Sequence, residues 1–168
     1  MNVIKNLFVL GAALTFVSCG TTSSGSKSDT PFVTDSCFLN ESIQNGGIEY
    51  KVTNVYNTKR IGSEYLYTET ENNFVVLSMI VKNITNEEVV VFDDMLLYII
   101  GENTYKVSST GGMYLDNGFY FSQNVGAGLS KSFDVAYEIP EEYKETDYLL
   151  IKASLNSNVS KSIYMRNR

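Results

Sequence analysis

The chain has 168 residues, with 13 basic and 19 acidic side chains and a formal net charge of −6. This acidic balance argues against nucleic acid as a partner, because a nucleic-acid-binding surface neutralises phosphates with Lys and Arg. The sequence contains no histidine. Its absence excludes Ser-His-Asp and Cys-His catalytic arrangements and zinc sites of the cysteine/histidine type.

The beginning of the chain has the pattern of an export signal. Lys5 is the one charged residue before an almost wholly apolar run over residues 7–17. That run fits the apolar core of a signal peptide and is too short for a membrane-spanning helix, which needs about 20 apolar residues. A buried N-terminal helix or an uncleaved anchor fits poorly, because a polar Ser/Thr/Gly stretch follows at once.

Ser18-Cys19, at the end of the apolar run, resembles the lipobox of bacterial lipoproteins, in which a small residue precedes an invariant cysteine. Phe16 departs from the pattern, since Leu is commonest at its position. The resemblance implies that residues 1–18 are removed and that Cys19 carries a diacylglycerol. The protein would then be lipid-anchored to the cell membrane, on its extracytoplasmic face, because several acyl chains give durable anchoring.

The segment after the lipid is rich in Ser, Thr and Gly, and we expect residues 19–36 to be a flexible tether. Acylation consumes the sulfur of Cys19, which leaves Cys37 without an intramolecular partner, because the chain has only two cysteines. Two interpretations of Cys37 stay open. It is either a small, half-buried apolar residue, which we favour, or a reactive or intermolecular thiol.

The remaining sequence has the periodicity of β-strands. Apolar residues alternate with polar ones over residues 48–53, and a continuous apolar run over residues 74–81 is typical of a central strand. Further strands are expected at residues 88–92, 95–100 and 104–107. A break at Asp93-Asp94 avoids a strand of about 13 residues. With that break, connections 57–73 and 108–128 would lie at the same end of a sandwich.

The clearest alternation covers residues 129–139 and ends at Pro140, which cannot donate to a strand ladder. Another strand is expected over residues 148–155, and a short edge strand over residues 162–165. Residues 141–144 offer the only helical turn. In the strands over residues 129–139 and 148–155, we expect the following side chains to point inward: Leu129, Phe133, Val135, Tyr137, Ile139, Leu149, Ile151, Ala153 and Leu155. Residues 37–168 are therefore predicted to form an all-β, immunoglobulin-like antiparallel sandwich of about 7–8 strands.

Three stretches in this region, residues 75–85, 98–105 and 128–140, resemble the telokin-like family of bacterial lipoprotein domains. They correspond to an apolar strand ending in Asn and a turn, a hairpin, and a strand that runs from Gly to Pro. The last stretch departs from the family, which often has Pro-Gly before the strand. The resemblance covers about residues 47–154. It implies an immunoglobulin-like fold and brings no established activity with it.

Carboxylates are the remaining candidates for chemistry. Asp93-Asp94 and Asp116-Asn117-Gly118 could offer oxygen ligands to calcium. Adjacent acids on a strand point to opposite faces, however, and Asp-Asn-Gly is first of all a turn sequence. A glycosidase-like pair is less favoured still, because no feature selects two particular carboxylates. We therefore expect no metal, no cofactor and no enzymatic activity.

The tyrosines are the more suggestive residues, since the chain has 12 of them and no tryptophan. Tyr65 and Tyr67 fall in the first long connection, and Tyr114 and Tyr120 fall in the second. Exposed tyrosines supply rigid, amphipathic contact area. The alternative is that such residues close the ends of the sandwich, with Phe119 and Phe121 filling the core.

These patterns favour an extracytoplasmic binding or interaction domain whose candidate surface is Tyr65, Tyr67, Tyr114 and Tyr120 and whose ligand is a protein or another cell-surface component. One alternative is a structural or envelope-stress lipoprotein whose purpose is to be tethered. A hydrolase that uses paired carboxylates is the weakest alternative.

Overall fold

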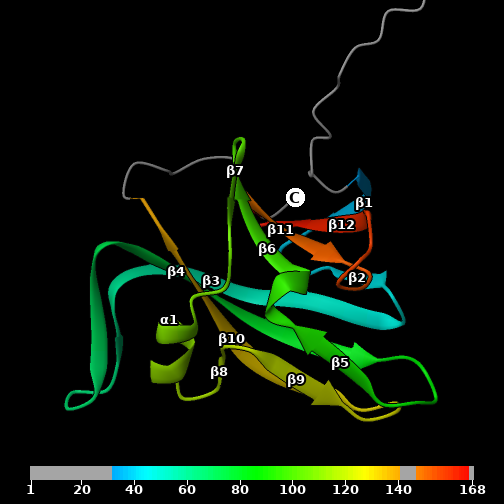
Figure 1. The fold of residues 1–168 in the computed structure, drawn as a ribbon, viewed down its shortest axis with the longest axis horizontal. Helices are drawn as coiled ribbons and strands as arrows, with labels where there is room; N and C mark the ends of the chain where they lie inside the picture. The colour runs from blue at the N-terminus through cyan, green and yellow to red at the C-terminus, as the bar shows by residue number, and fades with distance from the viewer. Residues whose placement is uncertain (1–31, 141–146, 167–168) are drawn as a thin grey trace, which may run out of the picture.

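The computed structural model describes residues 32–140 and 147–166 (Figure 1). The expected signal peptide, Cys19, the tether up to residue 31 and the helical turn at residues 141–144 lie outside the described residues. The strands are β1 (Phe32–Phe38), β2 (Ser42–Asn45), β3 (Ile48–Gly62), β4 (Tyr67–Asn83), β5 (Val89–Phe92), β6 (Leu96–Ile100), β7 (Asn103–Tyr105), β8 (Gly118–Phe119), β9 (Ser122–Val125), β10 (Ser130–Ile139), β11 (Asp147–Lys152) and β12 (Val159–Tyr164). A 3-10 helix η1 (Asp93–Met95) and a short helix α1 (Ser109–Tyr114) complete the fold.

Two five-stranded sheets form the sandwich. One has the order β1-β12-β11-β6-β7, the other has the order β2-β3-β4-β10-β8, and β5 pairs with β9 in a separate two-stranded sheet. In Figure 1 the first sheet lies above the second. The prediction of an all-β sandwich is confirmed. The described residues form twelve strands instead of 7–8, and two pairings, β1 with β12 and β8 with β10, are parallel instead of antiparallel.

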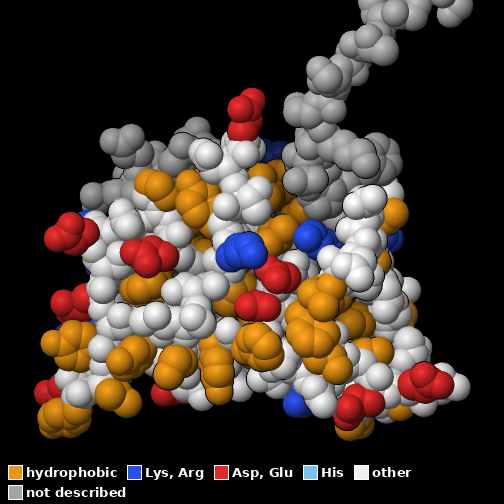
Figure 2. Space-filling model, viewed as in Figure 1, with side chains coloured by type: hydrophobic (Ala, Val, Ile, Leu, Met, Phe, Trp, Pro, Cys, Tyr) orange, Lys and Arg blue, Asp and Glu red, His pale blue; other side chains and the backbone are white. Residues whose placement is uncertain are grey.

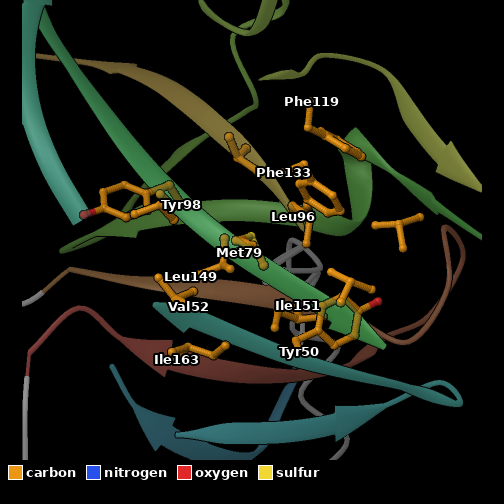
Figure 3. Packing of buried hydrophobic residues seen from close by; sticks show 14 of the residues in the cluster. Tyr50, Val52, Met79, Leu96, Tyr98, Phe119, Phe133, Leu149, Ile151 and Ile163 are labelled. Atoms are coloured by element: carbon orange, nitrogen blue, oxygen red, sulfur yellow. The ribbon is translucent and has the colours of Figure 1, made fainter. Parts of the chain in front are cut away.

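The core lies between the two sheets and contains side chains from both (Figure 3). Tyr50 and Val52 of β3 and Leu149 and Ile151 of β11 are fully buried there, as their alternation predicts. Burial of this apolar surface is the main force that holds the sheets together. The strand predicted over residues 129–139 is confirmed as β10, Ser130–Ile139, in which Phe133, Val135, Tyr137 and Ile139 are buried.

Two side chains expected to point inward are exposed instead, Leu129 to 62% and Leu155 to 44%. Both lie just outside a strand, since β10 begins at Ser130 and β11 ends at Lys152. The pleat that alternates side chains between two faces does not extend into these turns. The inward direction predicted for them is therefore wrong.

The first and last strands pair with each other. Cys37 of β1 lies opposite Ile163 of β12 in a parallel register, and the Thr34 hydroxyl donates to the carbonyl oxygen of Ser160 at 3.2 Å. Residues 32–36 therefore belong to the sheet, and the boundary of the flexible tether at residue 36 is wrong. The C-terminal strand lies between β1 and β11, not at an edge as expected.

The break predicted at Asp93-Asp94 is confirmed, because η1 separates β5 from β6. Before the break the chain pairs with β9, with Val89 opposite Val125. After it, β6 pairs with β11 and β7. The break thus allows the chain to leave the two-stranded sheet and enter the sandwich.

The two long connections are not loops. Residues 57–73 continue β3 and β4 as an antiparallel arm, whose last pair is Gly62 with Tyr67. Residues 108–128 contain α1, β8 and β9. The arm and α1 nevertheless pack together, as α1 contacts β3 and β4. Figure 1 shows the arm beside α1 at the lower left. The prediction that both segments lie at the same end holds only for the α1 part of residues 108–128, because Val125 at the end of β9 bonds to Asn83 at the opposite end of β4.

Candidate interaction surface

Arg60 shapes the tip of the arm. Its guanidinium carbon lies 3.7 Å from the centre of the Tyr67 ring, a cation–π contact. Its Nη2 donates to the carbonyl oxygens of Ser63 and Glu64 at 3.3 and 3.2 Å. The turn held in this way presents Tyr65 at the tip with 89% of its surface exposed.

α1 covers the outer face of the sheet next to the arm. The Oγ of Ser108 caps the helix, because it accepts a hydrogen bond from the Gly111 amide at 3.1 Å. A Cβ at Gly111 would lie 2.8 Å from the Cβ of Ala136, and one at Gly112 would lie 2.4 Å from the carbonyl oxygen of Phe119. The two glycines therefore allow α1 to approach β10 and β8 more closely than a side chain would permit.

A small apolar cluster joins the arm to α1. Its buried members are Ile61 of the arm, Phe74 and Val76 of β4, and Ala136 of β10. Tyr114 and Leu115 pack half-buried against them from the helix side. The cluster fixes the position of α1 relative to the base of the arm.

The four tyrosines singled out in the sequence have two different environments. Tyr65, Tyr67 and Tyr120 are exposed at the surface, the last to 50%. Tyr114 lies half-buried against the cluster between the arm and α1. Tyr65 and Tyr67 therefore belong to the exposed tip of the arm, Tyr120 lies beside Gly112 of α1, and Tyr114 is a packing residue between the arm and the helix.

Three further apolar side chains extend this surface and were not among the candidates. Leu66, Met113 and Phe121 are 67%, 68% and 63% exposed. Of the two phenylalanines expected in the core, only Phe119 is buried, stacked on Phe133 with ring centroids 4.8 Å apart. Leu66 stands between two tyrosines in the sequence, which is the signal that could have identified it.

We call the exposed apolar residues of the arm tip, of α1 and of the segment after β8 the aromatic ridge: Tyr65, Leu66, Tyr67, Met113, Tyr120 and Phe121. Figure 2 shows apolar side chains following the lower edge of the molecule, from the tip of the arm past α1 toward β9. A soluble domain seldom exposes a large set of apolar side chains on one side without a use for it. The ridge therefore has the character of a contact surface.

A polar hollow of about 290 Å³ lies between the arm and α1. Its lining includes Tyr56, Tyr114, Asp116 and Asp134. Burial raises the pKa of Tyr56, and the negative charge of Asp134 raises it further. Like any tyrosine hydroxyl at neutral pH, the Tyr56 hydroxyl is protonated and can donate a hydrogen bond into the hollow.

A second, more apolar hollow of about 380 Å³ lies beside β5, on another part of the molecule. Ile48, Val89, Phe92 and Leu155 are among the residues that line it. It offers few polar groups that could orient a ligand or assist a reaction.

The carboxylates considered for calcium are scattered. Among residues 32–140 and 147–166, no group of three or more Cys, Asp or Glu side chains is positioned to hold a metal ion. Asp94 accepts a hydrogen bond from Nζ of Lys106 at 2.8 Å. Asp116 lies at the polar hollow, and the neighbouring Asn117 donates its amide to the carbonyl oxygen of Ser132.

Cys37 is 7% exposed and has no disulfide partner among the residues that the structure describes. Burial raises the pKa of its thiol to about 11, and the charges of Glu41 and Asp35 add to the shift. A thiol that stays protonated is a poor nucleophile. The structure thus supports the apolar interpretation of Cys37 over the reactive one.

Within the part of the chain that the structure describes, no helix has the length and apolar character needed to cross a membrane.

The comparisons with known proteins identify a family and a fold. The profile of a family described as "Domain of unknown function (DUF4352)" matches residues 38–160. No curated protein matches the chain. The telokin-like family is not among these matches, so that resemblance stays a prediction.

Several solved structures share the fold at low sequence identity. The yjhA protein of Bacillus subtilis has a TM-score of 0.59 and 10% identity, over 77% of this chain and 98% of its own. A conserved hypothetical protein of Bacillus anthracis also has a TM-score of 0.59, with 16% identity over 76% of this chain and 94% of its own. A "putative lipoprotein (ycdA)" of Bacillus subtilis has a TM-score of 0.55 and 12% identity, over 74% of this chain and 38% of its own. At such identities the likeness concerns the fold alone.

Proposed function

Because the chain belongs to the DUF4352 family, a domain of unknown function, we propose a function from its own surface. We propose that it is a non-enzymatic binding module that contacts a protein on the cell surface through the aromatic ridge. A lipid on Cys19 holds it at the extracytoplasmic face of a bacterial membrane.

The exposure of the aromatic ridge is the observation that carries the proposal. Tyr65 and Leu66, at the tip of the arm, are 89% and 67% exposed, and Met113 of α1 is 68% exposed. Exposed apolar groups on this scale are stabilised when a partner removes them from water. Tyrosines add contact area at a low cost in side-chain entropy, because they have only two rotatable side-chain bonds.

Two observations support the lipid anchor. The apolar run over residues 7–17 ends at Ser18-Cys19, and one protein of similar fold is described as a "putative lipoprotein". The position of the first strand also suits the proposal. In Figure 1, β1 lies on the right and the tip of the arm lies at the lower left, so a chain held through its N-terminus can present the ridge away from the membrane.

The experiment compares the wild-type chain with a variant carrying Tyr65→Ser, Leu66→Ser and Tyr120→Ser. Both are incubated with intact envelope of the source cells stripped of the native protein, and the retained fraction is measured. The variant should lose at least tenfold in retention while its thermal midpoint stays within about 2 °C, because the exposed side chains add little to stability.

The matched control removes exposed apolar groups elsewhere, with Ile84→Ser and Leu155→Ser, each 44% exposed in the wild type. This variant should be retained like the wild type. Equal retention of all three proteins would contradict a role for the aromatic ridge.

A further inference from the structure

One side of β3 is open over most of its length. β2 pairs with β3 only from Ile48 to Lys51. The carbonyl oxygen of Val52 then accepts a hydrogen bond from the Asn40 amide at 2.9 Å. Beyond this point, among the described residues, β3 has a neighbouring strand only on its other side, where β4 lies. Figure 1 shows β3 running on past β2 into the arm.

The backbone groups on the open side belong to Val55 and Asn57. Along a strand, successive side chains point to opposite faces of the sheet, and successive backbone N–H and C=O groups point to opposite edges. Residues whose side chains share a face therefore direct their N–H and C=O groups to the same edge. Val52 points into the core and its carbonyl points toward the β2 side. Val55 and Asn57 lie opposite the core residues Leu77 and Val75 and share that face. Their N–H and C=O groups therefore point to the open side.

The open stretch has defined ends. Irregularities in the pairing with β4 fall between Val52 and Asn54 and between Thr58 and Arg60. The regular stretch between them, residues 54–58, has the sequence Asn-Val-Tyr-Asn-Thr and carries no charge. Bulges and charged residues are the usual protection of an exposed strand edge. Here the irregularities and the charged residues lie on either side of residues 54–58, and these five residues themselves have no such protection.

The occupant that matches such an edge is an extended polypeptide, because its own N–H and C=O groups alternate with the same spacing. A second copy of β3 does not fit in the symmetric register centred on the open stretch. In an antiparallel pair centred on Tyr56, Arg60 of the copy would lie opposite Val52, a place already taken by Asn40. A short linear segment can end before it reaches Asn40.

The charges beside the stretch indicate which segment fits. β3 carries Lys51 and Lys59 beside this stretch and the single acid Glu49, in a chain whose net charge is −6. Its third basic residue, Arg60, is turned to the arm, where its Nε lies 3.9 Å from Oε1 of Glu69. Lys51 and Lys59 stand on either side of the open residues. Opposite charges on neighbouring strands attract each other, which favours acidic side chains at both ends of an added segment.

We propose that the open edge of β3, residues 54–58, binds an extended segment of a partner polypeptide that adds to the sheet as a strand and carries acidic residues at its ends. The site is separate from the aromatic ridge. It does not depend on the function proposed for the ridge.

The test selects ligands from a displayed library of linear heptapeptides, using the full chain in a mild detergent. The decisive pair of variants is Asn57→Pro and Asn57→Ala. Proline removes the N–H that faces the open side and is tolerated at a strand edge, whereas alanine keeps this N–H. Selected peptides should be rich in Asp and Glu. They should bind the wild type and Asn57→Ala within about threefold of each other and bind Asn57→Pro at least tenfold more weakly.

Amide hydrogen exchange supplies a second measurement that needs no variant. A selected peptide should slow the exchange of the Val55 and Asn57 amides in the wild-type chain. The ridge variant with Tyr65→Ser, Leu66→Ser and Tyr120→Ser should bind the same peptides as well as the wild type does.

Four results would overturn the proposal: no enrichment of any peptide, protection of other amides only, loss of binding in the ridge variant, or a dimer of the wild type in sedimentation that Asn57→Pro abolishes. The last result would show that the edge binds a second copy of the chain.

Discussion

The side-chain amide of Asn83 joins the end of β4 to the end of β9, because its Nδ2 donates to the carbonyl oxygen of Val125 at 2.9 Å. Asn83 is fully buried. Its Nδ2 also donates to the carbonyl oxygen of Glu87, and its Oδ1 accepts from the amide and hydroxyl of Thr85 at 2.8 and 2.7 Å. One side chain thus shapes the turn after β4 and holds it against the two-stranded sheet.

Replacement of Asn83 by alanine should lower the free energy of unfolding by roughly 3 kcal/mol, because it removes a buried hydrogen bond to the Val125 carbonyl and part-buried ones to Glu87 and Thr85. Urea unfolding followed by circular dichroism measures the change. The control is Asn86→Ala in the same turn, where the side chain is exposed and the expected loss is below about 0.5 kcal/mol. Equal losses in the two variants would contradict a structural role for the buried amide.

Strands that are buried on one face could be predicted from the sequence. The alternation over residues 48–53 and 133–139 records which side chains face the core, and the polar pair Asp93-Asp94 marks the point where the chain changes sheets. The arm could not be predicted in this way. In the arm, residues 57–62 of β3 and 67–73 of β4, every side chain except Ile61 is exposed or half-buried, so no apolar alternation indicates the strands.

The parts of the fold that depend on distant contacts were also missed. β1 is a strand because it pairs with β12, more than 120 residues away, and its own sequence, with three polar residues in the middle, has no apolar alternation. α1 has the sequence Ser-Thr-Gly-Gly-Met-Tyr, which is a poor helix former because of its two glycines. Its position comes from packing against β10 and β8. Phe121 is exposed although Phe119 is buried. This difference could not be predicted either, because it depends on how the segment that contains both residues packs against the rest of the fold.

Tyr65 and Tyr114 should respond differently to the same substitution. Tyr65→Ser should change the free energy of unfolding by less than about 0.5 kcal/mol, since the side chain is 89% exposed. Tyr114→Ser should cost about 1–3 kcal/mol, because the ring packs half-buried against Ile61 and Phe74. Chemical denaturation of both variants measures the difference. A loss of the same size at Tyr65 would show that the tip of the arm is packed in solution.

Cys37 should resist modification in the folded protein. Its burial and a pKa of about 11 leave little thiolate at pH 8. Iodoacetamide at pH 8 should label Cys37 at least a hundredfold more slowly in buffer than in 6 M guanidinium chloride, as measured by mass spectrometry of the peptide that contains it. Similar rates in the two solvents would indicate an open, reactive thiol.

Alkaline pH should destabilise the fold, because the buried tyrosine hydroxyls and the Cys37 thiol resist losing their protons. Burial raises the pKa of the Tyr50, Tyr98 and Tyr137 hydroxyls, and at Tyr98 a hydrogen bond to Asp147 adds to the effect. A raised pKa means that the folded state holds the proton more tightly than the unfolded state does. These groups take nothing from the stability of the fold below their pKa values in the unfolded chain, 9.0 for Cys37 and 10.0 for the tyrosines. As the pH rises above these values, the unfolded chain ionises first and the stability of the fold falls.

The thermal midpoint should therefore be nearly constant from pH 7 to about 8.5 and should fall steeply above pH 10. Tyr98→Phe isolates one contribution. It removes the titrating hydroxyl and keeps the ring that stacks on Tyr137 with centroids 5.1 Å apart. This variant should be less stable than the wild type at pH 7, because Asp147 loses its hydrogen bond, and the difference should shrink as the pH approaches 11. A gap between the two midpoints that stays constant over this range would show that ionisation of Tyr98 does not limit the fold.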